Sequence, residues 1–524
     1  MGRYIVILLS LLFAAPAAAE WREASSRHFI VYSEGSEESV RAFATKLERF
    51  HQAMNRVQGA QDEDLGAASR LTVYVVPDLN GVRRLARAPA SSPIAGFYVA
   101  RAGGSIAVTP RRSGEGDETD LKAETILLHE YTHHMMRQRM SGAIPVWYNE
   151  GFAEFGSTAR FEKNGDVGIG MPPVHRAYGL FSDSALSVQH LFDAANRKLT
   201  QEEQEATIYG RGWLLTHYLA FEKSRNGQLS AYLKAINSGQ DSLEAAKAAF
   251  GDLKKLDREL RDYLMKRRIS YVLVEAAGIE PGPVTVRTLR PGEAAIMPMR
   301  MRSNLGVTST EAKGVAKEMR AAAAPYANDP AVQAALAEAE FDAQDLDAAE
   351  AAADRSIAAD PQNIDALLYK ARVLIARAEK EENSASLFKE ARRLIAKANR
   401  TDPDNPKPLI LFYSSFANEG VAATANAVKG LVHAQAVAPH DMNLRMMVAR
   451  QHLIDGKAAE ARAMLKAPAY DPHGGGLKKA ASAILAKLDE AGPKAALDTW
   501  DSLGSKEAEE EEEEETAKKK SGTR

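Results

Sequence analysis

Two histidines four residues apart, His129 and His133, are the residues of this chain best suited to chemistry. If the segment is helical, both side chains lie on one face about one turn apart, and both imidazoles can reach a single ion. Glu130 stands between them and can face the same space. The pattern His-Glu-x-x-His is typical of a zinc hydrolase site, in which the glutamate is the general base that takes a proton from zinc-bound water and passes it to the leaving amine. We therefore expect one Zn²⁺ ion per chain.

A catalytic zinc ion keeps three protein ligands and one open position for water. His129 and His133 supply two ligands, and Glu150 is the strongest candidate for the third, because a helix–loop–helix with sixteen intervening residues can return an acid to the same ion. Asn149, beside Glu150, is expected to support the ligands from outside the coordination sphere. Glu154 follows Glu150 by one helical turn, so we expect it to accept a hydrogen bond from the distal nitrogen of a ligating histidine.

The two motifs, His-Glu-x-x-His from His129 and Asn-Glu-Gly-Phe-Ala-Glu from Asn149, resemble those of the glutamate-zincin metallopeptidases. This peptidase MA-like superfamily includes thermolysin and the aminopeptidase N group. The resemblance implies that Glu150 is the third zinc ligand and that Glu154 is the supporting carboxylate. The segment Tyr-Gly-Arg-Gly from Tyr209 is similar to the Tyr-x-Lys-Gly segment of the aminopeptidase N group, which implies that Tyr209 donates to the oxyanion of the tetrahedral intermediate. The alternative is an amphipathic helix start with this tyrosine in the core.

Two departures from the aminopeptidase N group bear on the substrate. The spacer before Glu150 is two residues shorter, and the chain lacks the Gly-x-Met-Glu-Asn segment that anchors a free substrate amine there. We therefore expect an endopeptidase rather than an aminopeptidase. The segment from Gly103 to Ala107 is predicted to pair with an extended substrate by strand addition.

The first half of the chain combines strand and helix patterns. β-Branched runs predict strands at 29–32 and 71–76, and Gly103-Gly104 between two short apolar runs predicts a hairpin. The spacing of apolar residues predicts helices over 37–57, 121–139, 147–155, 209–222, 229–236 and 256–275. We therefore predict an α+β zincin-like metallopeptidase domain over residues 20–276, with the two motifs on consecutive helices.

From residue 308 to residue 495 the chain is alanine-rich and helical in period. Prolines recur at spacings of 31, 42, 36 and 33 residues, namely Pro330, Pro361, Pro403, Pro439 and Pro472. A period of about 34 residues closed by proline is typical of tetratricopeptide-like (TPR-like) helix–turn–helix repeats. We therefore predict an all-α repeat domain, with an insertion around 380–386 where the spacing is longest. A generic alanine-rich bundle is the alternative, and the glycine- and proline-rich residues 277–307 predict a linker or small β element.

The two ends of the chain are predicted to lie outside the folded domains. Residues 1–19 have a basic start, an apolar middle and small residues before Glu20, which is typical of a secretory signal peptide. Residues 496–524 include the unbroken run from Glu509 to Glu515 and predict a disordered acidic tail. The signal peptide predicts an exported protein, periplasmic or secreted, with no integral membrane segment after signal cleavage. The chain has no cysteine, which favours a bacterial periplasm over a eukaryotic secretory route. The net charge of −3 argues against nucleic acid as a partner.

The sequence therefore predicts an exported zinc-dependent peptidase whose repeats recruit a protein substrate or another protein partner. Two alternatives remain open. The chain could be a TPR-like scaffold with an inactive or autoinhibited zincin domain, or the zinc site could hydrolyse something other than a peptide bond.

Overall fold

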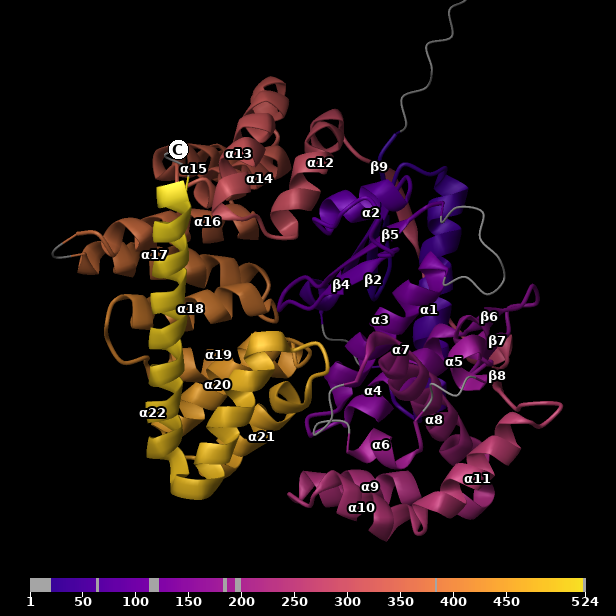
Figure 1. Ribbon diagram of the computed structural model, residues 1–524. Helices are drawn as coiled ribbons and strands as arrows, with labels where there is room; N and C mark the ends of the chain where they lie inside the picture. The colour runs from indigo at the N-terminus through magenta and orange to yellow at the C-terminus, as the bar shows by residue number, and fades with distance from the viewer. Residues whose placement is uncertain are drawn as a thin grey trace, which may run out of the picture.

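A computed structural model describes residues 20–62, 66–112, 122–181, 186–193, 199–381 and 384–521. The predicted signal peptide lies outside these residues. The described chain forms an N-terminal unit built on a sheet and a C-terminal array of paired helices beside it (Figure 1). None of the described helices is both long enough and apolar enough to cross a membrane.

The main sheet has six strands in the order β4-β5-β3-β2-β1-β9. Strands β2, β3 and β5 are mutually parallel, whereas β1 runs antiparallel to β2, β9 to β1 and β4 to β5. The predicted strands and hairpin are part of this sheet. Its strands are β1 (Arg22–Ser25), β2 (Phe29–Ser33), β3 (Leu71–Val76), β4 (Phe97–Val99), β5 (Ile106–Pro110) and β9 (Thr285–Thr288).

Helices cover both faces of the sheet because successive side chains of a strand point to opposite faces. Phe29 and Val31 of β2 join a core with α1 (Glu37–Gln58) and α3 (Ala123–Arg139). Tyr32 joins a second core on the other face, with α2 (Leu79–Leu85) and α12 (Pro291–Asn304). The helix that carries both histidines is thereby fixed against the sheet.

The helix with the second motif, α4 (Val146–Ser157), lies between α3 and α8 (Gly212–Phe221). Glycines permit this close approach. A Cβ atom on Gly151 would lie 2.3 Å from the carbonyl oxygen of Gly212, and one on Gly156 would lie 2.4 Å from the hydroxyl of Thr132. The glycine that follows Glu150 is therefore required for the packing that brings α4 to the histidines.

The rest of the N-terminal unit surrounds these helices. A three-stranded sheet has the order β6-β7-β8, with all pairs antiparallel. The predicted helix 256–275 is too long, because the structure ends it at Leu264 and pairs β8 with β7. The remaining elements are β6 (Arg160–Phe161), β7 (Val167–Ile169), β8 (Val272–Val274), α5 (Ala177–Phe181), α6 (Gln189–Phe192), α7 (Gln201–Gln204), the π-helix η4 (Glu205–Arg211), α9 (Gln228–Asn237), α10 (Ser242–Phe250) and α11 (Leu253–Leu264).

The C-terminal unit is a TPR-like array of helix pairs, α14/α15, α16/α17, α18/α19 and α20/α21. Small side chains such as Ala349 and Ala352 are fully buried and let paired helices approach closely. Four prolines, from Pro361 to Pro472, each lie three residues before the first helix of the next pair or before α22. The helices are α13 (Ser309–Ala323), α14 (Pro330–Asp342), α15 (Leu346–Ala359), α16 (Ile364–Ala378), α17 (Ala385–Thr401), α18 (Pro406–Asn418), α19 (Ala425–Val437), α20 (Met442–Ile454), α21 (Ala458–Tyr470) and α22 (Gly475–Ser521).

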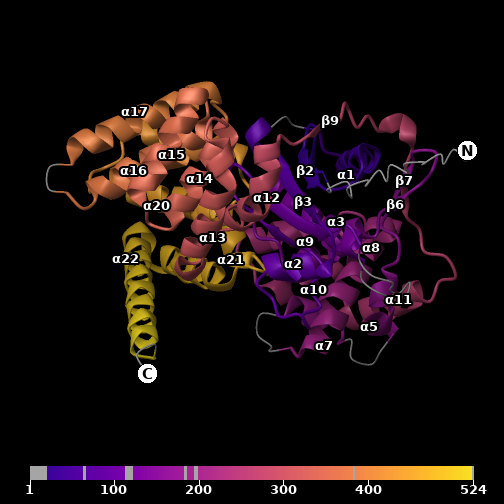
Figure 2. The same ribbon diagram turned by 90° about the horizontal axis from the view of Figure 1, so that it is seen from above.

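The residues predicted as a linker or small β element, 277–307, contain a short strand and also a helix that the sequence did not predict. Strand β9 extends the main sheet through β1, and α12 packs on both units. Met297 faces the sheet side, whereas the neighbouring Ile296 packs against α13 and α14. Figure 2 shows α12 between the sheet and the repeats. Helix α12 therefore belongs to the cores of both units, because adjacent apolar residues on one helix point in different directions.

The predicted tail also differs from the structure. Helix α22 continues through residue 521, with a break at Gly492, where φ is +82°. Ala496, Leu497, Trp500 and Leu503 pack against the last helix pair, so the repeat unit extends beyond residue 495. The physical reason is composition, because alanine, glutamate and lysine are among the strongest helix formers.

Candidate metal centre

Helices α3 and α4 bring His129, His133 and Glu150 together. The Nε2 atoms of the two histidines are 3.1 Å apart, and Oε2 of Glu150 lies 3.3 Å from Nε2 of His129 and 3.5 Å from Nε2 of His133. Ligand atoms about 2.0–2.2 Å from a tetrahedral ion are separated by roughly 3.3–3.6 Å. The three atoms therefore have the spacing of a zinc ligand set.

The surroundings of the three residues also fit a cation. The planes of the two imidazoles are 81° apart, so their Nε2 lone pairs can converge on one point. Glu150 is 1% exposed, and neither of its oxygens makes a hydrogen bond of good geometry. Burial alone would lower the pKa of His129, but Glu150 and Glu154 raise it above its ordinary value. The pocket thus favours a positive charge among these groups.

Asn149 fixes one of the histidines. Its Oδ1 atom lies 2.8 Å from Nδ1 of His133, which is buried. With the proton on Nδ1, the ring donates to Asn149 and its Nε2 atom keeps a free lone pair. This contact sets the tautomer that a metal ligand needs.

Glu154 does not form the expected hydrogen bond with a zinc-ligating histidine. Its Oε1 atom lies 3.7 Å from Nδ1 of His129, which is too long for a hydrogen bond. Arg176 instead donates two hydrogen bonds to Oε1, and Nε2 of His175 lies 2.9 Å from Oε2. Burial alone would raise the pKa of Glu154, but His175, His129 and Arg176 outweigh it and hold the pKa at about 2. The predicted direct hydrogen bond is therefore wrong, and Glu154 acts on His129 through its charge.

Glu130 and Tyr209 line one cleft with His129. The cleft has a volume of about 440 Å³ and is bounded on one side by residues 92–96 before β4. Tyr209 lies on the π-helix η4, with its ring centroid 6.1 Å from that of His129 and the Arg176 guanidinium 4.7 Å from its own. Burial raises the pKa of Tyr209, so its hydroxyl stays protonated and able to donate.

The expected position for strand addition needs a correction. Ile106 and Ala107 belong to β5, which lies inside the sheet between β3 and β4. The edge strand is β4, because the turn at Gly103-Gly104 folds it back on β5. The backbone before β4 is the part that borders the cleft.

The repeat array supplies a residue that sequence reasoning missed. His473, in the connection between α21 and α22, lines the same cleft, and its Nε2 atom lies 3.1 Å from Oε1 of Glu150. His175 and Arg176, the partners of Glu154, were missed as well. No spacing or motif in the sequence links these residues to the centre, because their positions depend on how distant segments pack.

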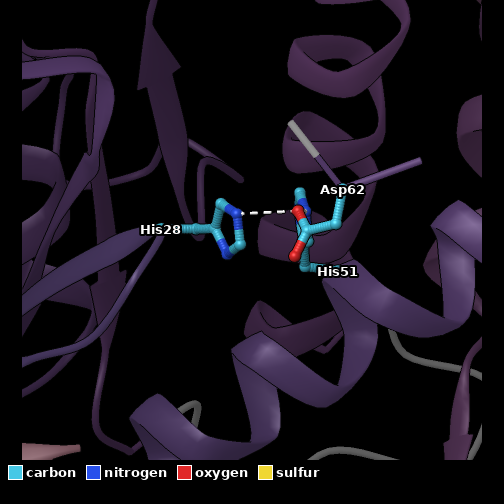
Figure 3. Close-up of side chains that lie close together, drawn as sticks. All are labelled: His28, His51 and Asp62. Carbon is cyan, nitrogen blue, oxygen red and sulfur yellow. Dashed lines mark hydrogen bonds and ion pairs between the residues drawn. The ribbon is translucent and has the colours of Figure 1, made fainter. Parts of the chain in front are cut away.

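Among the described residues, a second group of two histidines and one carboxylate also brings its possible ligand atoms close together. His28, His51 and Asp62 also place their ligand atoms within 4.8 Å of one another (Figure 3). Oδ1 of Asp62 lies 3.0 Å from Nε2 of each histidine. The two rings are stacked, however, with centroids 3.8 Å apart and planes 21° apart.

His51 and Asp62 of this second group already have other partners. The side-chain nitrogen of Asn55 lies 3.0 Å from Nε2 of His51, and Arg27 forms a 3.0 Å ion pair with Oδ2 of Asp62. The opposite ring nitrogens are 2.7 Å from Oε2 of Glu48 and from the hydroxyl of Tyr131. The group forms a hydrogen-bonded polar network that reaches α3 through Tyr131.

The chain was compared with protein-family models, curated proteins and solved structures. No protein-family model matches the chain, and no curated protein matches it significantly. Among solved structures, the chain is similar to the crystal structure of TTC0263, a thermophilic TPR protein in Thermus thermophilus. The match has 17% identity and a TM-score of 0.32, and covers 37% of this chain and 97% of that one. The TPR-like character of the array is shown by the pairing of its own helices.

Proposed function

We propose that this chain is an exported zinc-dependent peptidase, and more specifically an endopeptidase of the glutamate-zincin type. The observation that carries the proposal is the ligand set of His129, His133 and Glu150, with separations of 3.1–3.5 Å, at a cleft that Glu130 and Tyr209 also line. A bound zinc ion would supply Lewis acidity and a more acidic water at this point. The buried charge of Glu150, and its Oε2 atom without a hydrogen bond, support a cation there.

The side chains around the ion have separate roles in this proposal. Glu130 takes the proton from the attacking water and passes it to the nitrogen of the leaving peptide. Tyr209 donates a hydrogen bond to the oxygen of the reacting carbonyl as negative charge develops on it. An extended substrate would lie along the backbone before β4, with its scissile bond over His129.

The test measures metal and cleavage together on the full mature chain. Wild type should contain one zinc per chain and cleave members of a peptide library, and chelation should abolish cleavage. Glu130→Gln should keep the zinc and lose about 10²–10⁴-fold in kcat, the range typical of general-base catalysis. Wild type that lacks zinc after purification and zinc addition would refute the proposal.

Protein binding by the repeats is a second candidate function, and the charge of one cavity favours it. The cavity has a volume of about 420 Å³ and lies between the hairpin at Gly103 and helices α12, α14, α16 and α18. Six charged residues line it, four of them basic: Arg101, Arg300, Arg372, Lys407, Glu338 and Asp365. Burial raises the pKa of Glu338 to about 7, so this carboxyl is partly neutral near neutral pH. The cavity suits an acidic segment of a protein partner or substrate.

An acidic peptide tests this second function independently of catalysis. In the Glu130→Gln chain, a fluorescent peptide of aspartate and glutamate should bind, and binding should weaken steeply with salt. Arg372→Ala should weaken the binding further, whereas Arg393→Ala, on the exposed face of α17, should not. Equal binding to both variants would exclude this cavity as the binding place.

A further inference from the structure

The connection between α21 and α22 is held firmly against the helix of the metal centre. Nη2 of Arg137 contacts the two carboxylate oxygens of Asp471 at 2.9 and 3.2 Å, and both side chains are nearly buried. Arg137 follows His133 by four residues, so it lies on the same face of α3 as both histidines. Arg445 of α20 also donates to the carbonyl oxygen of Arg137, at 3.4 Å. The last helix pair is thus docked one turn from the ligands.

This docking places His473 beside Glu150, the proposed third zinc ligand. Oδ1 of Asp471 accepts a hydrogen bond from the backbone N–H of His473, at 3.0 Å, which orients the connection. The His473 ring then stands edge-on to that of His133, with centroids 5.5 Å apart, and its Nε2 atom lies 3.1 Å from Oε1 of Glu150. The two oxygens of Glu150 therefore face different groups, Oε2 the two histidines and Oε1 the repeat array.

We propose that His473 is a positioning residue of the zinc centre, supplied by the repeat array, which holds Glu150 so that Oε2 alone faces the ion. The inference rests on the proposed function, because it assumes a zinc ion at this place. A carboxylate that ligates a metal is oriented by the partner of its other oxygen, which here is the close ion-pair contact of His473 with Oε1. The centre is then complete only when the last helix pair is docked on α3.

The first measurement is zinc affinity, which does not depend on turnover. His473→Ala in the full chain should weaken zinc binding by about 10–100-fold, the usual effect of losing an outer partner of a metal ligand. His473→Gln should restore much of the affinity, because its side-chain amide can donate from a similar place. The control is His433→Ala, a half-exposed histidine of α19 that pairs with Asp404 away from the centre.

The second measurement uses the reciprocity of coupled equilibria. If docking of the connection strengthens zinc binding, then zinc must strengthen docking by the same factor. Removal of zinc from wild type should therefore speed amide hydrogen exchange at residues 471–475 and leave α14 unchanged. In His473→Ala, exchange at 471–475 should already be fast and should respond little to zinc.

The outcomes separate this inference from the proposed function. Wild type that binds no zinc refutes the proposed function and the inference together. Wild type that binds zinc and cleaves peptides, with unchanged zinc affinity in His473→Ala, refutes the inference alone. Tighter zinc binding by His473→Ala also refutes it, because His473 would then compete with the ion for Glu150.

Discussion

The described residues hold two groups of two histidines and one carboxylate, and only one of them has the geometry of a metal site. His129 and His133 have nearly perpendicular rings, whereas His28 and His51 are stacked. A metal ion must lie close to the plane of each imidazole that binds it. Nearly perpendicular planes can meet at such a point beside both rings, whereas the planes of two stacked rings, with centroids 3.8 Å apart and an angle of 21°, meet only far from the ring nitrogens. Residue types and distances alone therefore do not separate the two groups.

The carboxylates of the two groups, Glu150 and Asp62, also differ in the partners that surround them. Oε2 of Glu150 faces two ring nitrogens without a hydrogen bond of good geometry, which leaves a buried charge for a cation to neutralise. Asp62 is neutralised by Arg27 and lies beside both stacked histidines. The first group is arranged for an ion, and the second is a hydrogen-bonded network that holds Tyr131 and, with it, α3 in place.

The largest expected effect comes from removing a ligand. His133→Ala should reduce zinc affinity by more than the roughly 10–100-fold that outer partners contribute, whereas His51→Ala should keep one zinc per chain. Metal analysis after dialysis against a weak chelator measures both. Loss of zinc in His51→Ala, with the fold intact by circular dichroism, would overturn the distinction between the two groups.

An intermediate effect should appear in stability. His51→Ala leaves the buried hydroxyl of Tyr131 and the side chains of Asn55 and Asp62 without their common partner. An unpaired buried polar group costs about 1–3 kcal/mol, and we expect a loss of this size in the free energy of unfolding. Urea denaturation of the zinc-free proteins measures it, with His433→Ala as the control. An unchanged midpoint would show that the network contributes nothing to folding.

The smallest expected effect is a pH dependence of the second group. The hydrogen bond with His51 lowers the pKa of Asp62 from 3.8 to about 2, so its stabilising contribution is present above pH 3.8 and is lost as the pH falls towards 2. Because Asp62 is partly exposed, we expect roughly 1 kcal/mol. Zinc-free wild type should be more stable than Asp62→Asn at pH 5, and the difference should narrow below pH 3.8. A difference that does not change with pH contradicts the assignment.

The parts predicted well from the sequence are those that depend on local period. The helices around His129 and Glu150 lie within two residues of their predicted bounds, because apolar spacing and Pro145 mark them directly. The helix pairs follow from the proline spacing in the same way. Helix α12 and the helical start of the tail were not predicted, because the composition of both segments suggested loops, whereas Met297 and Trp500 pack into cores that other segments supply.

The sequence by itself determined that His129 and His133 share one helical face and that an acidic motif follows at a suitable distance, since the helix period fixes such relations along a single element. Only the tertiary structure decided which groups surround that pair. The angle between the rings, the turn of Glu154 towards Arg176 and the approach of His473 to Glu150 depend on the packing of segments far apart in the chain. Such contacts follow from how whole surfaces fit together, and no local pattern of residues records them.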